Sequence, residues 1–295
     1  MKIHPIAFLL IILLTTFLMG SSFAVGKIGL HYSSPLFLVS LRFLIAGGLM
    51  TLIVSLRGLP VPKRSIDWGK IATIGTLQTT GVMACTFLSL RTITAGESSI
   101  LIFTNPLLVV VFGSLLLRAR YRWTQWLGVV LGVLGVAITM GLHMQLKSGT
   151  ILGVVGACSW AIATLLMKRW SGICNVWVLT AYQMLCGGIL LLLLSLVLEQ
   201  PHFEWNLIST GILLWLAIMA SIVQFAGWFY VLGKGDAAQT SAFLFLAPFF
   251  GVLSGWLLLG EQVQWYVYIG GIFVFLGIFL VNWNFNKPKK EADPI

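Results

Sequence analysis

Residues 95–135 of the chain read AGESSILIFTNPLLVVVFGSLLLRARYRWTQWLGVVLGVLG, and residues 237–277 read AAQTSAFLFLAPFFGVLSGWLLLGEQVQWYVYIGGIFVFLG. Aligned without gaps at an offset of 142 residues, the two stretches are identical at 13 of 41 positions. Leucine and valine matches carry little weight in apolar sequence, whereas matched prolines, tryptophans and glycines are informative. The matches of these rarer kinds are Pro106/Pro248, Trp123/Trp265, Gly113/Gly255, Gly128/Gly270 and Gly135/Gly277. The chain is therefore predicted to contain two copies of one unit.

The duplication extends toward the start of each half with small shifts of the alignment. Ser22-Phe23-Ala24 aligns with Ser159-Trp160-Ala161, and Arg42 aligns with Gln183. The predicted domains are a first unit at residues 1–146, a second at 147–285 and a basic tail at 286–295.

The composition excludes a soluble protein. Of the 295 residues, 59% are hydrophobic and only 9% are charged, whereas a soluble domain carries roughly a quarter charged residues. The net charge of +10 could suggest a nucleic-acid partner. However, the lysines and arginines lie in short clusters between long apolar runs, which is typical of topology signals in membrane proteins. We therefore expect a lipid bilayer around the chain and no nucleic-acid partner.

The apolar runs predict ten transmembrane helices, since a span requires roughly 20 mostly apolar residues. The first run continues through Val25 and has a counterpart in the second half, so we interpret it as a retained helix and not as a cleaved signal peptide. A β-barrel is excluded because the runs are too long and do not alternate. The predicted helices span residues 6–27, 35–56, 68–90, 95–117, 123–141, 149–170, 176–198, 208–232, 237–259 and 266–283.

The lysines and arginines predict the orientation of these helices. With a cytoplasmic N-terminus, 14 of the 18 Lys and Arg residues lie on the cytoplasmic side. Lys27, Arg91 and Lys147 lie on the opposite side, and Arg42 lies within a span. This bias follows the positive-inside rule and predicts that both termini are cytoplasmic.

The odd number of helices in each unit predicts an inverted repeat. If one unit has five helices, the second copy enters the membrane from the opposite side. The predicted fold is therefore an all-α integral membrane protein with ten transmembrane helices in two inverted five-helix repeats. Such repeats build transporters whose substrate site lies between them near the midplane, and exchanging the conformations of the two repeats gives alternating access.

The whole chain resembles the drug/metabolite transporter superfamily, specifically its EamA-type bacterial members. The matching features are Gly-Ser-Ser-Phe-Ala at Gly20–Ala24, the mid-span prolines Pro106 and Pro248, and Leu-Leu-Gly-Glu at Leu258–Glu261. The resemblance implies a secondary transporter in the bacterial cytoplasmic (inner) membrane that exports amino acids or related compounds, aromatic ones included. Uptake or exchange of another small organic solute is the alternative. The resemblance also implies a homodimer.

The first half departs from the family pattern at one motif. Where the second half has Gly260 and Glu261, the first half has Arg118 and Ala119. Members of the family often carry Gly-Glu in both halves, so a role of this acidic residue is not expected in the first half.

Five residues are candidates for the wall of a substrate cavity. An unpaired amide in hydrocarbon costs several kcal/mol, so polar side chains near mid-helix are expected to face the bundle interior. Two readings stay open for the amides: hydrogen bonds between helices, worth about 0.6 kcal/mol on average, or a solute cavity. Trp228, Tyr182 and Tyr230 are assigned to interfacial aromatic belts. The candidates are Ser22, Gln78, Asn105, Trp160 and Gln224.

Arg42 and Glu97 are the candidate charges. Arg42 lies about seven residues, or ~10 Å, inside the outer end of the second helix. Intramembrane charges face a wet cavity or pair with another group, and Glu97 near the outer end of the fourth helix is the expected partner. Arg42 is therefore interpreted either as an attractor of a substrate carboxylate, or as part of an outer-gate ion pair, or as a side chain that extends to the membrane interface.

Pro106 and Pro248 are candidate hinges. Each proline removes a backbone hydrogen bond and permits a bend. The bend is either static or a hinge that exposes a carbonyl to the cavity.

The sequence carries no catalytic signature. Gly20 to Lys27 resembles a phosphate-binding loop, but the glycine spacing is too long and Ile28 replaces the required Ser or Thr. A membrane enzyme acting on lipids would need a nucleophile and base or a metal set at one interface, and no such pattern is present. We therefore expect no enzyme activity, no metal and no cofactor, and a small-molecule substrate.

Overall fold

The computed structural model describes residues 4–139, 147–170, 172–234, 243–262 and 264–282. Every regular element in these ranges is a helix, and an isolated β-bridge joins Ser33 to Phe203. The linker 140–146, the start of the predicted span 237–259 and the predicted tail 286–295 lie wholly or partly outside the described residues. The helices are α1 (Pro5–Gly29), α2 (Pro35–Leu56), α3 (Ser65–Gly75), η1 (Thr76–Gly81), α4 (Val82–Ser89), α5 (Ala95–Ile102), α6 (Asn105–Leu117), α7 (Trp123–Thr139), α8 (Ser148–Arg169), α9 (Val176–Leu198), α10 (Leu207–Leu214), η2 (Trp215–Val223), α11 (Gln224–Lys234), η3 (Phe243–Phe245), α13 (Leu246–Leu259) and α14 (Trp265–Asn282).

Seven helices among the described residues are long and apolar enough to cross a membrane. Three of these spans combine consecutive elements: α3–η1–α4, α5–α6 and α10–η2–α11. Three further helices, α7, α13 and α14, are apolar but shorter. The outward side chains are apolar as well, since Val197 is 79% exposed and Leu115 is 72% exposed. The chain is therefore a multi-pass, all-helical membrane protein, because only a bilayer would cover such a surface.

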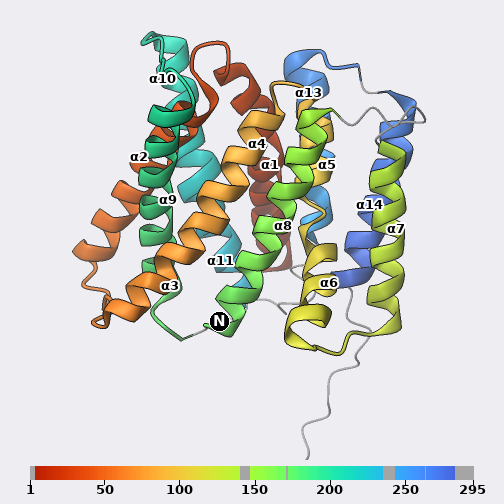
Figure 1. Cartoon of the computed structure of the whole chain (residues 1–295), viewed down its shortest axis with the longest axis horizontal. Coiled ribbons are helices and arrows are strands. Elements are labelled where there is room, and N and C mark those ends of the chain that lie inside the picture. Colours follow the sequence, from red (N-terminus) through yellow and green to blue (C-terminus); the bar gives the residue numbers. More distant parts are fainter. Residues whose placement is uncertain (1–3, 140–146, 171, 235–242, 263, 283–295) are drawn as a thin grey trace, which may run out of the picture.

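The helices form one bundle with two ends (Figure 1). We call the end at which α1, α3 and α9 begin the lower face, and the end at which α1 finishes the upper face. α2 and α9 pack together at one edge of the bundle, and α7 and α14 pack together at the other. Each of these pairs joins one helix from the first half of the chain to one from the second half.

Glycines hold α7 and α14 in backbone contact. A Cβ atom on Gly277 would lie 2.6 Å from the carbonyl oxygen of Gly128, and one on Gly270 would lie 2.5 Å from that of Gly135. Helices in lipid gain no hydrophobic driving force from each other, so small residues that permit close approach stabilise their association. These four glycines are the ones that the duplicated sequence aligns with each other.

The helices that end at Leu117 and Leu259 finish with the same backbone turn. Arg118 has φ 50° and Gly260 has φ 62°, both in the left-handed region. The amide of Ala119 donates to the Gly113 carbonyl at 3.0 Å, and the amide of Glu261 donates to the Gly255 carbonyl at 3.2 Å. The turn is retained where the sequence departs from Gly-Glu, although a left-handed conformation costs a non-glycine residue about 1–2 kcal/mol.

On the upper face, backbone hydrogen bonds join the α1–α2 connection to the α9–α10 connection. The amide of Ser34 donates to the His202 carbonyl at 3.0 Å, and the amide of Glu204 donates to the Tyr32 carbonyl at 2.8 Å. The Glu199 carboxylate accepts the Phe37 amide at 2.8 Å, which satisfies a free N–H at the start of α2. The α1–α2 and α9–α10 connections therefore cover this side of the bundle as one unit.

Replacing Gly277 with Ala tests the backbone contact between α7 and α14. We expect Gly277→Ala to lower the free energy of unfolding by roughly 1–2 kcal/mol, because the new methyl group forces the helices apart. Gly48→Ala is the matched control, since a Cβ atom there meets nothing within 4 Å. It should be neutral or stabilising by up to ~1 kcal/mol, the difference in helix propensity. Thermal unfolding in detergent measures both variants, and equal melting temperatures would contradict the contact.

Candidate functional site

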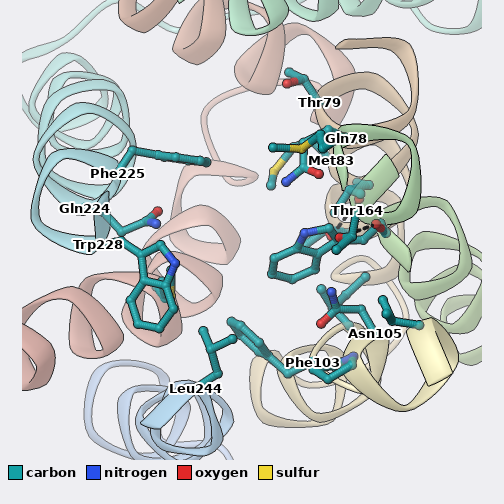
Figure 2. Close-up of a pocket in the computed structure, with 18 of the residues that line it drawn as sticks. Gln78, Thr79, Met83, Phe103, Asn105, Thr164, Gln224, Phe225, Trp228 and Leu244 are labelled. Atoms are coloured by element: carbon teal, nitrogen blue, oxygen red, sulfur yellow. Dashed lines mark hydrogen bonds between the residues drawn. The ribbon is translucent and has the colours of Figure 1, made fainter. Parts of the chain in front are cut away.

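A cavity of about 450 Å³ lies between helices of the first and second halves of the chain. Its volume falls within the ~300–1,000 Å³ typical of small-molecule sites. The structure brings all five predicted cavity residues to its wall, namely Ser22, Gln78, Asn105, Trp160 and Gln224. Figure 2 looks into this space, with Gln78 and Asn105 on one side and Gln224 and Trp228 on the other.

The three amides are not used to join helices. The side-chain oxygen of Gln78 is buried without a hydrogen-bond partner. Asn105 and Gln224 are 7% and 6% exposed, and within the described part of the chain neither side chain forms a hydrogen bond. Hydrogen bonds between helices therefore do not account for these three amides. Their donors and acceptors are available to a solute in the cavity.

Two π-helical segments position the glutamines. Gln78 lies within η1, and Gln224 directly follows η2. A π-helical turn is wider than an α-helical turn and occurs often at functional sites. Side chains from the opposite half of the chain bind its carbonyls: Ser159 Oγ donates to Leu77 at 2.8 Å, and Arg42 Nη2 donates to Ala220 at 2.8 Å.

Arg42 lies on the cavity wall, not in an ion pair with Glu97. Its Nε donates to Ser221 Oγ at 2.9 Å, Nη2 binds the Ala220 carbonyl, and the side chain is buried at 4% exposure. The guanidinium carbon also lies 4.9 Å from the centre of the Phe43 ring. The predicted Arg42–Glu97 pair is therefore wrong, because neutral groups on η2 take the place of the carboxylate.

Glu97 caps the helix α5. Its amide donates to Thr94 Oγ1 at 3.0 Å, and its carboxylate accepts the Thr94 amide at 2.9 Å. This reciprocal pair is a capping box, whose sequence signature is Ser or Thr followed three residues later by Glu. Thr-Ala-Gly-Glu at Thr94–Glu97 carries that signature, so the capping role was readable from the sequence.

The hydrogen bond between α2 and η2 has an equivalent between η1 and α9. Thr79 Oγ1 donates to Gln183 Oε1 at 2.7 Å. Thr79 and Ser221 are 142 residues apart, and Arg42 and Gln183 are 141 apart, which matches the offset of the duplication. The same helix contact thus occurs twice, once with a neutral amide and once with a cation.

Aromatic rings form much of the remaining wall. Trp160 lies 5.6 Å from Phe103, measured between ring centres. Trp228, predicted to lie in an interfacial belt, also lines the cavity and is 9% exposed. Its spacing of four residues from Gln224 places both on one helix face, and this signal would have identified it.

The two prolines lie in the first turns of α6 and α13; α6 follows an interruption of the helix, whereas α13 directly follows the 3-10 segment η3. The fourth span is interrupted at Phe103 and Thr104, and Pro106 is the second residue of α6. Pro106 lines the cavity, whereas Pro248, the third residue of α13, is buried and its carbonyl accepts a hydrogen bond from Ser99 at 3.5 Å. Proline fits the first turn of a helix because its missing N–H has no partner there. Their role as hinges stays a prediction.

The upper end of the bundle is tied by an ion pair that sequence reasoning missed. Lys27 Nζ lies 2.8 Å from Glu261 Oε1, and it also donates to the Ile93 carbonyl at 2.9 Å. The Glu261 carboxylate accepts the Ala95 amide at 2.9 Å, at the positive end of the α5 dipole. The pair therefore joins α1, the start of α5 and the end of α13. Leu-Leu-Gly-Glu at Leu258–Glu261 was the available signal.

The lower end of the cavity reaches Tyr121, Gln125 and Met167. The Tyr121 hydroxyl donates to the Val109 carbonyl at 3.3 Å. Burial raises the pKa of this phenol, so it stays neutral and retains its donor at physiological pH. The cavity thus extends from mid-bundle toward the lower face, while the Lys27–Glu261 pair lies at the upper face.

The wall is equipped to bind a solute. Its polar groups are amides, hydroxyls and one guanidinium, and its apolar groups are largely aromatic. No group of three His, Cys, Asp or Glu side chains that could hold a metal ion occurs among the residues the structure describes. Such a wall supports hydrogen bonding and stacking of a small organic molecule.

The chain is similar to curated proteins and to a solved structure over nearly its whole length. The chain is 25% identical over 284 residues to an uncharacterized transporter, YoaV of Bacillus subtilis, covering 94% of this chain and 97% of the relative. It is 26% identical to a probable amino-acid metabolite efflux pump of Salmonella typhimurium, covering 92% and 94%. A solved crystal structure shares the fold with a TM-score of 0.67 at 19% identity, covering 92% of this chain and 95% of that one.

The family model for EamA-like transporters matches the chain twice, at residues 6–141 and 147–283. Each match covers one of the two halves that the internal duplication defines. The two relatives given above are named as a transporter and as an efflux pump. This protein is a transporter that belongs to the EamA-like transporter family.

Proposed function

We propose that the protein is a secondary transporter that moves small organic metabolites by alternating access between two inverted five-helix repeats. The observation that carries the proposal is the cavity, whose wall comes from helices of both halves. Three amides of this wall, those of Gln78, Asn105 and Gln224, form no hydrogen bond within the described structure. A site between two repeats is the arrangement expected when one repeat rocks against the other. The proposed repeats are residues 1–146 and 147–285.

Contacts that occur twice support the inverted repeat. The Arg42–Ser221 and Gln183–Thr79 hydrogen bonds stand at equivalent positions. Equivalent positions of the two halves are also occupied by the left-handed turns after α6 and α13 and by the paired glycines of α7 and α14. Each of the two hydrogen bonds joins one half to the other, so exchanging the conformations of the halves would exchange equivalent contacts.

We assign the lower face to the cytoplasm, because 14 of the 18 Lys and Arg residues are expected there. The Lys27–Glu261 pair then closes the extracellular side, and the cavity extends toward the cytoplasm. In this assignment the structure is an inward-facing state, with both termini in the cytoplasm of a bacterial cell.

We propose export of amino acids or related metabolites, aromatic ones included. The Salmonella relative is named as a probable amino-acid metabolite efflux pump, and Trp160, Trp228 and Phe103 offer aromatic surfaces. Uptake or exchange is the alternative direction, since a two-state transporter is reversible and the gradients decide. Assembly as a homodimer stays a prediction.

Counterflow in liposomes tests the transport function. Vesicles containing the protein and an unlabelled amino-acid metabolite should accumulate the labelled compound from outside. We expect Asn105→Ala and Gln224→Ala each to lower this flux by roughly fivefold to tenfold, because each removes a hydrogen bond to the solute. Their melting temperatures should stay close to the original, since neither side chain is bonded within the described structure.

Asn175→Ala is the control for the flux measurement. Asn175 is exposed at the lower face and caps α9 by accepting the Trp177 amide at 2.9 Å. Its loss should cost about 1 kcal/mol of stability and leave the flux unchanged. A folded protein that exchanges no solute of the panel would contradict the proposed transport function.

Thiol labelling tests the inward-facing assignment. We expect Ser22→Cys, in a chain without its four native cysteines, to react with a membrane-impermeant maleimide from the cytoplasmic side alone. Adding Glu261→Gln should permit labelling from both sides, because it removes the charge that pairs with Lys27. Glu204→Gln, which breaks an exposed contact with His202, should change nothing. Labelling of Ser22→Cys from the extracellular side without Glu261→Gln would refute the assignment.

A further inference from the structure

The charge of the cavity is unbalanced. Arg42 is the only charged side chain among the described residues that line it. The described residues provide no Asp or Glu on this wall, and Arg42 forms none of their ion pairs. A buried charge without a counter-charge is costly in a membrane protein and marks a functional site.

The packing of the helices does not require this charge. At the equivalent position, Gln183 makes the matching contact with Thr79 as a neutral amide of 4% exposure. The same helix crossing is therefore built once with Gln and once with Arg. Since a glutamine suffices for the packing, the packing among the described residues gives no use for the positive charge of Arg42.

The hydrogen bonds of Arg42 hold the guanidinium at the wall and leave part of it available. Nε is bonded to Ser221 and Nη2 to the Ala220 carbonyl. Within the described structure Nη1 has no hydrogen bond, and the side chain borders the cavity. A guanidinium fixed by two of its nitrogens is preorganised for an oxyanion at the third.

We propose that the cavity selects organic anions, with Arg42 binding a carboxylate or similar group and the aromatic wall holding an apolar body. This inference rests on the proposed function, in which the cavity is the transport site. The buried oxygen of Gln78 lacks a donor, so a solute that also carries an N–H or O–H group fits best. Among amino-acid metabolites, N-acylated acids, which carry both a carboxylate and an N–H group, therefore fit better than cations.

Three probes of one shape test this selectivity on the purified protein in detergent. They are 3-phenylpropionate, its neutral amide 3-phenylpropanamide, and the cation 3-phenylpropylammonium, with binding measured by titration calorimetry. We expect the anion to bind roughly tenfold or more tightly than the amide, as a charge-assisted hydrogen bond provides. The cation should bind more weakly than the amide. Equal or absent binding of the three probes would overturn the inference.

Arg42→Gln reproduces the residue of the equivalent position and removes the charge. In this variant the affinity for 3-phenylpropionate should fall to the affinity for 3-phenylpropanamide. Arg57→Gln, at the exposed end of α2, removes the same charge outside the cavity and should keep the tenfold preference. If Arg42→Gln does not fold, Arg42→Lys retains the charge without the fork and should keep a reduced preference for the anion. If Arg42→Gln kept the full tenfold preference for the anion over the amide, the proposal that Arg42 binds the anionic group would be refuted.

The binding measurement separates this inference from the proposed function. Binding of the anion that depends on Arg42, without counterflow in liposomes, would retain the inference and refute transport. Counterflow of neutral or cationic solutes that Arg42→Gln leaves unchanged would retain transport and refute the inference.

Discussion

The need to satisfy every backbone hydrogen bond within hydrocarbon governs this structure. A free carbonyl in a membrane costs several kcal/mol, so helices depart from regular geometry only where another group binds the released atoms. η1 and η2 are such places, and the groups that bind their carbonyls include Ser159 and Arg42 from the opposite half of the chain. The irregular backbone is therefore both the joint between the halves and the support of the glutamines that face the cavity.

Close packing at the edges of the bundle leaves the cavity between them. Gly128 and Gly277 bring α7 and α14 into backbone contact, and Gly47 places α2 against the backbone of Leu185 in α9. These contacts bury small residues that offer no polar group. Toward the middle, larger side chains such as Trp160 and Trp228 hold the helices apart. The site thus lies between helices that carry large residues toward the middle of the bundle, such as α8 and α11, while the helix pairs at the edges meet through small residues.

Much of the helical framework followed from local sequence. A long apolar run has no other folded solution in a bilayer, so the helices could be placed to within a few residues. The capping box at Thr94–Glu97 is equally local, and reading it would have removed Glu97 as the partner of Arg42. Contacts between residues far apart in the chain were harder to predict from the sequence. The ion pair of Lys27 with Glu261, which are 234 positions apart, was not predicted.

The sequence by itself determined that the chain is helical, lies in a membrane, contains two related halves and carries Gln78, Asn105, Trp160 and Gln224 near mid-helix depth. Hydropathy and spacing encode depth, because each residue adds a constant rise along a helix. Only the tertiary structure decided what each polar group faces. Whether Arg42 meets Glu97, Ser221 or a cavity depends on the rotation and contact of helices far apart in the chain, and no local pattern specifies that angle.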